Sequence, residues 1–208
     1  MPTIADAVRP RRTGAILANW LLAYVFALFA YAHARMFVEH PRLSLALIVA
    51  VEALLVVFIL TRKDADQTRH SWKTWLSTVA GTFCPLLLRP VEAPADMLAG
   101  QMLQLAGAGL QIAALASLNR SMGLLPAHRG VKSRGLYCFV RHPLYVAYAI
   151  TLTGYLISNL SVYNATVISI GMAFQLWRIH NEEKLLLQYP DYVTFAAKTR
   201  WRMIPYVW

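Results

Sequence analysis

Long runs without a charged residue constrain this chain more than any other feature of its sequence. Residues 15–34 carry no charge, residues 97–118 carry none, and residues 143–177 are uncharged for 35 positions. A helix needs about 20 apolar residues to cross the hydrocarbon of a bilayer. Only 14% of the 208 residues are charged, about half the share that is usual in soluble domains. We therefore expect an integral membrane protein.

These runs predict an all-α, polytopic helical bundle with six membrane segments. One helix over residues 143–177 would be about 52 Å long at ~1.5 Å per residue, which is more than a bilayer requires. The turn-forming residues Ser158, Asn159, Ser161 and Asn164 predict that this run folds back as a short helical hairpin. The expected segments are residues 15–34, 43–60, 74–88, 97–118, 144–157 and 165–177.

The basic residues indicate the orientation of the segments. Six segments place both termini on one side, and all but three of the 20 Lys and Arg residues then fall on that side. The three exceptions are Arg35, Arg42 and Arg89. Basic loops face the cytoplasm in membrane proteins, so we expect both termini there. The Arg-rich start lacks a small-residue cleavage site, which favours a retained first helix over a signal peptide. Cys84 and Cys138 are expected to be free thiols.

Polar residues inside the expected segments mark either a functional cavity or a contact between helices, because they are costly in hydrocarbon. Glu52 lies near the middle of the second segment. It fits a cavity wall or a proton site, and it also fits a carboxyl group bonded to another helix, which we favour. Gln101, Gln104 and Gln111 lie on one side of the fourth segment, and we favour a packing face cross-linked by amides.

Small residues form a second feature of the fourth segment. Gly109, Ala113 and Ser117 recur every four positions, which is typical of a ridge where two helices approach closely. We therefore expect this ridge to face a neighbouring helix.

The cytoplasmic loop before the fifth segment is basic and rich in glycine, and it ends in a distinctive cluster. Pro143 fits the first turn of a helix, so Arg141 and His142 would lie beside free backbone N–H groups at the membrane surface. Tyr137 and Tyr145 flank them. The cluster suits an amphipathic ligand with a polar head and a flat ring.

A second cluster begins where the sixth segment leaves the membrane. Arg178 and Glu182 are four residues apart and share one helix face, whereas Glu183 points about 100° away. Because the hairpin turns and returns, its two ends should be neighbours, which predicts a site at the mouth of the bundle. Residues 189–205 follow, and we expect a cytoplasmic interfacial helix with a basic and aromatic end.

Three ordered motifs resemble the isoprenylcysteine carboxyl methyltransferase (ICMT) family of integral membrane enzymes. Gly135-Leu136-Tyr137 leads to residues 140–145, Val-Arg-His-Pro-Leu-Tyr; then come Arg178 with Glu182-Glu183, and Tyr192 with Ile204-Pro205. The resemblance divides a single membrane domain, residues 1–208, into three N-terminal helices (1–96) and an ICMT-like catalytic core (97–208). The shortened pattern at residues 189–192 is more similar to small bacterial members, which implies a bacterial inner membrane with a cytoplasmic active site.

The resemblance also implies a cofactor and roles for individual residues. The implied methyl donor is S-adenosyl-L-methionine, and no metal is implied. Arg178 and Glu182 take the catalytic positions, and with Glu183 they take the substrate-binding positions. The implied cofactor-binding residues are Arg129, Gly130, Val131, Lys132, Tyr137, Arg141, His142, Pro143, Leu144 and Tyr145.

The implied reaction is transfer of a methyl group to a lipophilic or lipid-modified acceptor within the bilayer. Carboxylate methyl-esterification is favoured, and N- or O-methylation stays open. We weigh two alternatives, an NADPH-dependent membrane enzyme similar to sterol reductases and a non-catalytic lipid-binding protein. No nucleic acid partner is expected, and the sequence leaves the oligomeric state and the identity of the acceptor open.

Overall fold

The structure is a computed structural model, and it describes residues 12–39, 41–61, 67–68, 72–89, 91, 97–118, 121, 127–128 and 130–208. The regular elements of this part of the chain are helices, apart from one antiparallel pair of two-residue strands. The helical class predicted from the sequence is therefore confirmed. The elements are α1 (Arg12–Glu39), α2 (Leu43–Thr61), β1 (Gln67–Thr68), α3 (Trp72–Phe83), η2 (Cys84–Leu87), α4 (Leu98–Leu118), β2 (Ala127–His128), η4 (Gly135–Cys138), α5 (Pro143–Ser158), α6 (Val162–Leu186) and α7 (Pro190–Lys198).

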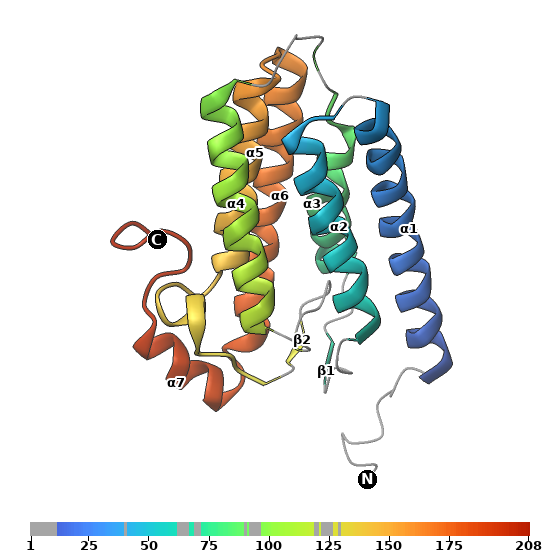
Figure 1. Cartoon of the computed structure of the whole chain (residues 1–208). Coiled ribbons are helices and arrows are strands. Elements are labelled where there is room, and N and C mark those ends of the chain that lie inside the picture. Colours follow the sequence, from blue (N-terminus) through green and yellow to red (C-terminus); the bar gives the residue numbers. More distant parts are fainter. Residues whose placement is uncertain are drawn as a thin grey trace.

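The six helices α1 to α6 form an elongated bundle (Figure 1). The turn between α5 and α6 lies at one end of this bundle, whereas α7 and the strands β1 and β2 lie at the other. Helix α3 runs along α6, and two hydrogen bonds about one and a half turns apart join them. Asn181 donates to the Ser77 hydroxyl at 3.3 Å, and Gln175 donates to the Gly81 carbonyl at 2.9 Å. The end that carries α7 also carries the candidate site.

The helix bounds agree with the expected segments within three residues, except that α1 ends five residues later than expected, α3 ends five residues earlier, and α6 extends well beyond its segment. That helix continues to Leu186, nine residues past the expected end of its membrane segment at Trp177. Its last turns therefore carry Arg178, Glu182 and Glu183 on regular helix. The C-terminal helix is α7, which ends at Lys198; residues 199–205, expected to continue it as its basic and aromatic end, form bends and turns instead.

The predicted hairpin turn is held by buried asparagines. The Ser161 hydroxyl caps α6 by accepting from the Asn164 backbone N–H at 3.1 Å. The fully buried Asn164 side chain donates to the Asn159 carbonyl at 2.8 Å and to the Arg89 carbonyl at 2.8 Å. These bonds join the turn to the segment after η2, so the polar residues of this turn are structural.

Helices α4 and α5 approach closely at glycines. A Cβ atom at Gly107 would lie 2.7 Å from the backbone nitrogen of Thr151, and one at Gly154 would lie 2.6 Å from the Gly100 carbonyl oxygen. Gly109 has no atom within 4 Å of its Cβ position. The expected ridge of small residues is therefore wrong at Gly109, because the helix turns Gly100 and Gly107 toward α5 instead.

Two described helices are long and apolar enough to cross a bilayer by length and composition, Trp20–Glu39 and Leu98–Leu118. Leu45–Thr61 and Pro143–Ser158 are shorter apolar helices. Six membrane segments with both termini cytoplasmic stay a prediction.

Candidate functional site

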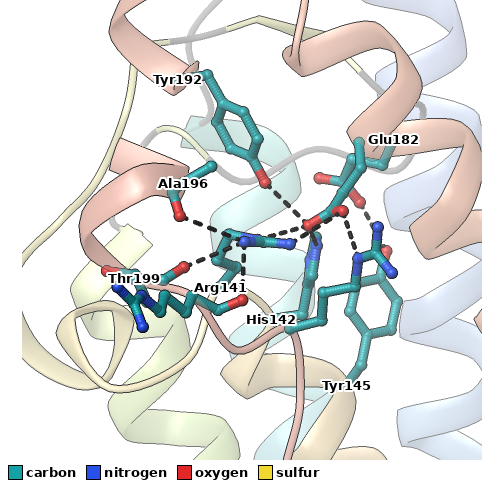
Figure 2. A network of polar contacts seen from close by, with 10 residues as sticks. Arg141, His142, Tyr145, Glu182, Tyr192, Ala196 and Thr199 are labelled. Atoms are coloured by element: carbon teal, nitrogen blue, oxygen red, sulfur yellow. Dashed lines mark hydrogen bonds and ion pairs between the residues drawn. The ribbon is translucent and has the colours of Figure 1, made fainter. Parts of the chain in front are cut away.

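The two ends of the α5–α6 hairpin meet at the carboxylate of Glu183. Arg141 donates to both of its oxygens, from Nε at 2.6 Å and from Nη2 at 3.2 Å. Arg202 donates from Nε at 2.5 Å, and His142 Nε2 lies 3.2 Å from Oε1. An ionised carboxylate only accepts hydrogen bonds, so Nε2 of His142 carries a proton. Figure 2 shows these side chains converging with the hydroxyl of Tyr192, which lies 3.5 Å from Oε1.

Opposing effects set the charge of this carboxyl group. Burial would raise the pKa of Glu183, but the hydrogen bonds from His142, Arg141 and Arg202 outweigh it and lower the pKa to about 2. Burial, followed by the nearby charge of Glu183, raises the pKa of Tyr192. Near neutral pH the carboxylate is therefore ionised and the phenol keeps its proton.

Arg141 also holds the end of α7. Its Nη1 donates to the carbonyl oxygens of Thr199 at 3.1 Å and Arg200 at 3.0 Å (Figure 2). The backbone N–H groups of Arg141 and His142 donate in turn to the carbonyls of Trp201 and Arg202. Arg141 therefore ties the C-terminal segment to the start of α5, and its expected contact with a cofactor stays a prediction.

Glu182 lies on a different face of α6 from Glu183. Tyr145 donates to its Oε2 at 2.9 Å from the first turn of α5. Arg178 lies one turn earlier, with its guanidinium carbon 5.6 Å from the centre of the Tyr145 ring and Nη1 within 3.3 Å of Thr82 Oγ1. The buried side chain of Tyr145 thus contacts both the carboxylate of Glu182 and the guanidinium of Arg178.

A cavity of about 310 Å³ connects this region with the interior of the bundle. Its volume lies at the small end of the range for ligand pockets. Of the site residues suggested by the sequence, Gly130, Val131, Lys132, Tyr137, Arg141, His142, Leu144, Tyr145, Arg178 and Glu182 line it. Pro143 and Glu183 are not among its lining residues, and Arg129 lies outside the described residues.

The loop that closes the cavity depends on two glycines in the left-handed region. Gly130 has φ +81° and Gly135 has φ +63°, conformations that strain other residues. A Cβ atom at Gly135 would also lie 2.3 Å from Ser117 Oγ at the end of α4. These glycines allow the loop to pass close to α4 and bring Val131 and Tyr137 to the cavity.

Several lining residues were not assigned to the site from the sequence. Tyr192 and Phe195 reach the cavity from α7, and Glu52, Gln104 and Gln111 line it from α2 and α4. Glu52 is also bonded to another helix, through His33 of α1 at 3.0 Å. The favoured interpretations, a bonded carboxyl for Glu52 and a packing face for the glutamines, are both contacts between helices. Neither interpretation predicts that these side chains also line the cavity. Periodicity gives a helix face but not which neighbour that face meets.

The comparisons with known proteins bear on the second half of the chain. Residues 99–188 match the model of the family described as "Isoprenylcysteine carboxyl methyltransferase (ICMT) family", which confirms the resemblance found in the sequence. The comparisons with curated proteins and with solved structures find no match. The match spans α4 to α6, so the part of the chain that carries most of the candidate site is similar to a family named for methyl transfer.

Proposed function

We propose, with this family match as the premise, that the chain is an S-adenosylmethionine-dependent methyltransferase acting on a membrane-embedded lipid or isoprenoid-type acceptor. One observation carries the proposal. Eight of the ten residues that the resemblance assigns to the cofactor line the same cavity as the pair Arg178 and Glu182. That cavity continues between apolar side chains of α2, including Leu47 and Leu55. A polar donor and a lipophilic acceptor would thus share one space.

The residues present fit the methyl donor. S-adenosylmethionine presents a carboxylate, two cationic groups and a flat aromatic base, and the cavity wall offers Lys132 and the rings of Tyr137, Tyr145 and Phe195. Cations bind well over aromatic faces. In this proposal Gly130 to Lys132, Tyr137, His142, Leu144 and Tyr145 hold the cofactor, which supplies an activated methyl group.

Once the cofactor supplies the methyl group, the reaction depends more on how the acceptor is positioned than on proton transfer. Displacement at a methyl carbon needs an in-line nucleophile that has lost its water, and the apolar cavity would remove that water. A carboxylate acceptor is already ionised at neutral pH, so Arg178 would orient it and Glu182 would hold Arg178. We favour this esterification because the matched family is named for it. With an amine or hydroxyl acceptor, Glu182 would take the proton instead.

Binding of the demethylated product is the first test. Calorimetry of the detergent-purified protein with S-adenosylhomocysteine should give saturable binding, whereas NADPH should give none. Absence of S-adenosylhomocysteine binding at millimolar concentration would overturn the proposal and leave the reductase or a lipid-binding role. Binding of NADPH alone would favour the reductase.

Turnover is the second test. The protein is incubated with methyl-labelled S-adenosylmethionine and a lipid extract of the source organism, and the labelled lipids are treated with mild base. We expect base-labile label, as in a methyl ester. Base-stable label would show N- or O-methylation and make Glu182 the general base.

A further inference from the structure

The inner part of the cavity contains polar groups at a depth where the surrounding wall is apolar. Phe26, Val51 and Leu55 line it from α1 and α2. Among them lie four buried polar side chains from three different helices: Glu52, Gln104, Gln111 and Gln175. Their exposed fractions lie between 3% and 7%. Polar groups are costly in such a place unless they find partners.

One carboxyl oxygen of Glu52 already has a hydrogen-bond partner within the protein. Its Oε2 lies 3.0 Å from Nδ1 of His33 on α1. That contact involves one of the two carboxylate oxygens, and a carboxylate has about four acceptor sites. Glu52 therefore keeps capacity to accept a hydrogen bond from a group inside the cavity.

The glutamines provide independent evidence for a missing partner. The amide nitrogen of Gln104 and the amide oxygen of Gln175 are both buried without a hydrogen-bond partner in the part of the chain that the structure describes. Gln175 uses its nitrogen on the Gly81 carbonyl at 2.9 Å. Buried polar atoms are rarely left unsatisfied in proteins, so a donor and an acceptor in one cavity wall indicate a ligand that supplies both.

We propose that this inner region, formed by Glu52, Gln104 and Gln175, binds a hydroxyl group carried part way along the apolar body of the methyl acceptor. A hydroxyl is the smallest group that both donates and accepts, so it can accept from the unpartnered Gln104 amide nitrogen and donate its one proton to Glu52. The Gln175 amide oxygen would then accept from a buried water beside the ligand. The inference rests on the proposed function, because only a methyltransferase has a methyl acceptor. The substrate class becomes a hydroxylated amphiphile, with one polar group at the cytoplasmic end of the cavity and one deeper in the bundle.

A binding experiment without methyl donor tests this site apart from catalysis. Stearic acid is compared with its monohydroxy isomers, whose hydroxyl lies at successive positions along the chain, by calorimetry in detergent. We expect at least one mid-chain isomer to bind about tenfold more tightly than stearic acid, because one buried hydrogen bond changes a dissociation constant by about that factor. Equal binding of stearic acid and all isomers would overturn the proposal.

Substitutions test which side chains cause the preference for a hydroxylated isomer over stearic acid. Glu52→Leu should remove it while stearic acid still binds, and Gln104→Leu should reduce it. Glu52→Gln keeps the shape of the side chain and should weaken the preference without removing it, which provides a readout if Glu52→Leu does not fold. Glu39→Gln is the matched control, because Glu39 is exposed and paired with Arg35 on α1; it should keep the full preference.

The same data separate three outcomes. Loss of stability in the Glu52 variants with an unchanged isomer preference would mean that Glu52 only links α1 to α2, and it would overturn the proposal. If S-adenosylhomocysteine does not bind but the isomer preference depends on Glu52, the proposed methyltransferase fails and the hydroxyl site stands. If the cofactor binds and no isomer is preferred, the methyltransferase stands and the hydroxyl site fails.

Discussion

Tyr145 donates a 2.9 Å hydrogen bond from its phenol to Oε2 of Glu182, which joins the first turn of α5 to the last turns of α6. The bond fixes the carboxylate of Glu182 at the wall of the cavity, which Arg178 also lines. A neighbouring carboxylate, Glu183, is bonded to three cationic or imidazole side chains and to Tyr192. Two adjacent acidic residues therefore have different tasks, and substitutions should separate them.

Replacement of Glu182 should affect turnover and not cofactor binding. Glu182→Gln keeps the size of the side chain but removes the charge that orients Arg178 or accepts a proton, so we expect turnover to fall by about a hundredfold or more. Tyr145→Phe should reduce turnover less, because it removes only the bond that positions Glu182. Labelled methyl transfer and S-adenosylhomocysteine calorimetry measure the two effects. The exposed Lys184→Gln on the same helix is the control, and wild-type turnover in Glu182→Gln would contradict the site.

Replacement of His142 should affect cofactor binding. His142 is buried at the start of α5, lines the cavity and stacks edge-on against Tyr145 at 5.6 Å between ring centres. His142→Ala removes a cavity wall and one partner of Glu183. We expect the dissociation constant for S-adenosylhomocysteine to rise by about tenfold, as for the loss of one hydrogen-bonded contact. An unchanged dissociation constant in a folded variant would place the cofactor elsewhere.

Acid should destabilise the protein through Glu183. The carboxyl has a pKa of about 2 in the folded chain against an ordinary value of 4.5. A lowered pKa means that its stabilising contribution is present above pH 4.5 and disappears as the pH falls toward 2. The shift corresponds to about 3 kcal/mol. Denaturant unfolding of the detergent-solubilised protein at a series of acidic pH values should show this loss.

Glu183→Gln is the comparison for that experiment. It removes the titrating group and leaves Arg141 and Arg202 without their buried anion, so the variant should be less stable by about 3–5 kcal/mol at neutral pH. Its stability should also depend less on pH over the acidic range than that of the wild type. A variant whose pH dependence runs parallel to the wild type would show that other carboxyl groups cause the acid sensitivity.

The sequence predicted the hairpin because an uncharged run of 35 residues exceeds one bilayer crossing. Because the two predicted helices of the hairpin are similar in length, the sequence also predicted that the start of the first lies close to the end of the second. The role of Glu183 was not predictable in the same way, because Arg202 and Tyr192 reach it from segments that follow the hairpin. Gln104 and Gln111 were predicted to share one side of their helix, and both line the cavity. The rotation of each helix against its neighbours decides which face lines a cavity, and the sequence does not give that rotation.

The packing of α4 against α5 gives a stability test with a control on the same helix. A Cβ atom at Gly107 would lie 2.2 Å from Thr151 Oγ1 and 2.7 Å from the Thr151 backbone nitrogen. The backbone cannot move aside cheaply, so Gly107→Ala should destabilise the protein by about 1–3 kcal/mol. Gly109→Ala meets nothing within 4 Å and should stabilise α4 by about 0.5 kcal/mol, because alanine loses less backbone entropy than glycine. Denaturant unfolding of both variants measures the difference, and equal stabilities would show that α5 does not pack on Gly107.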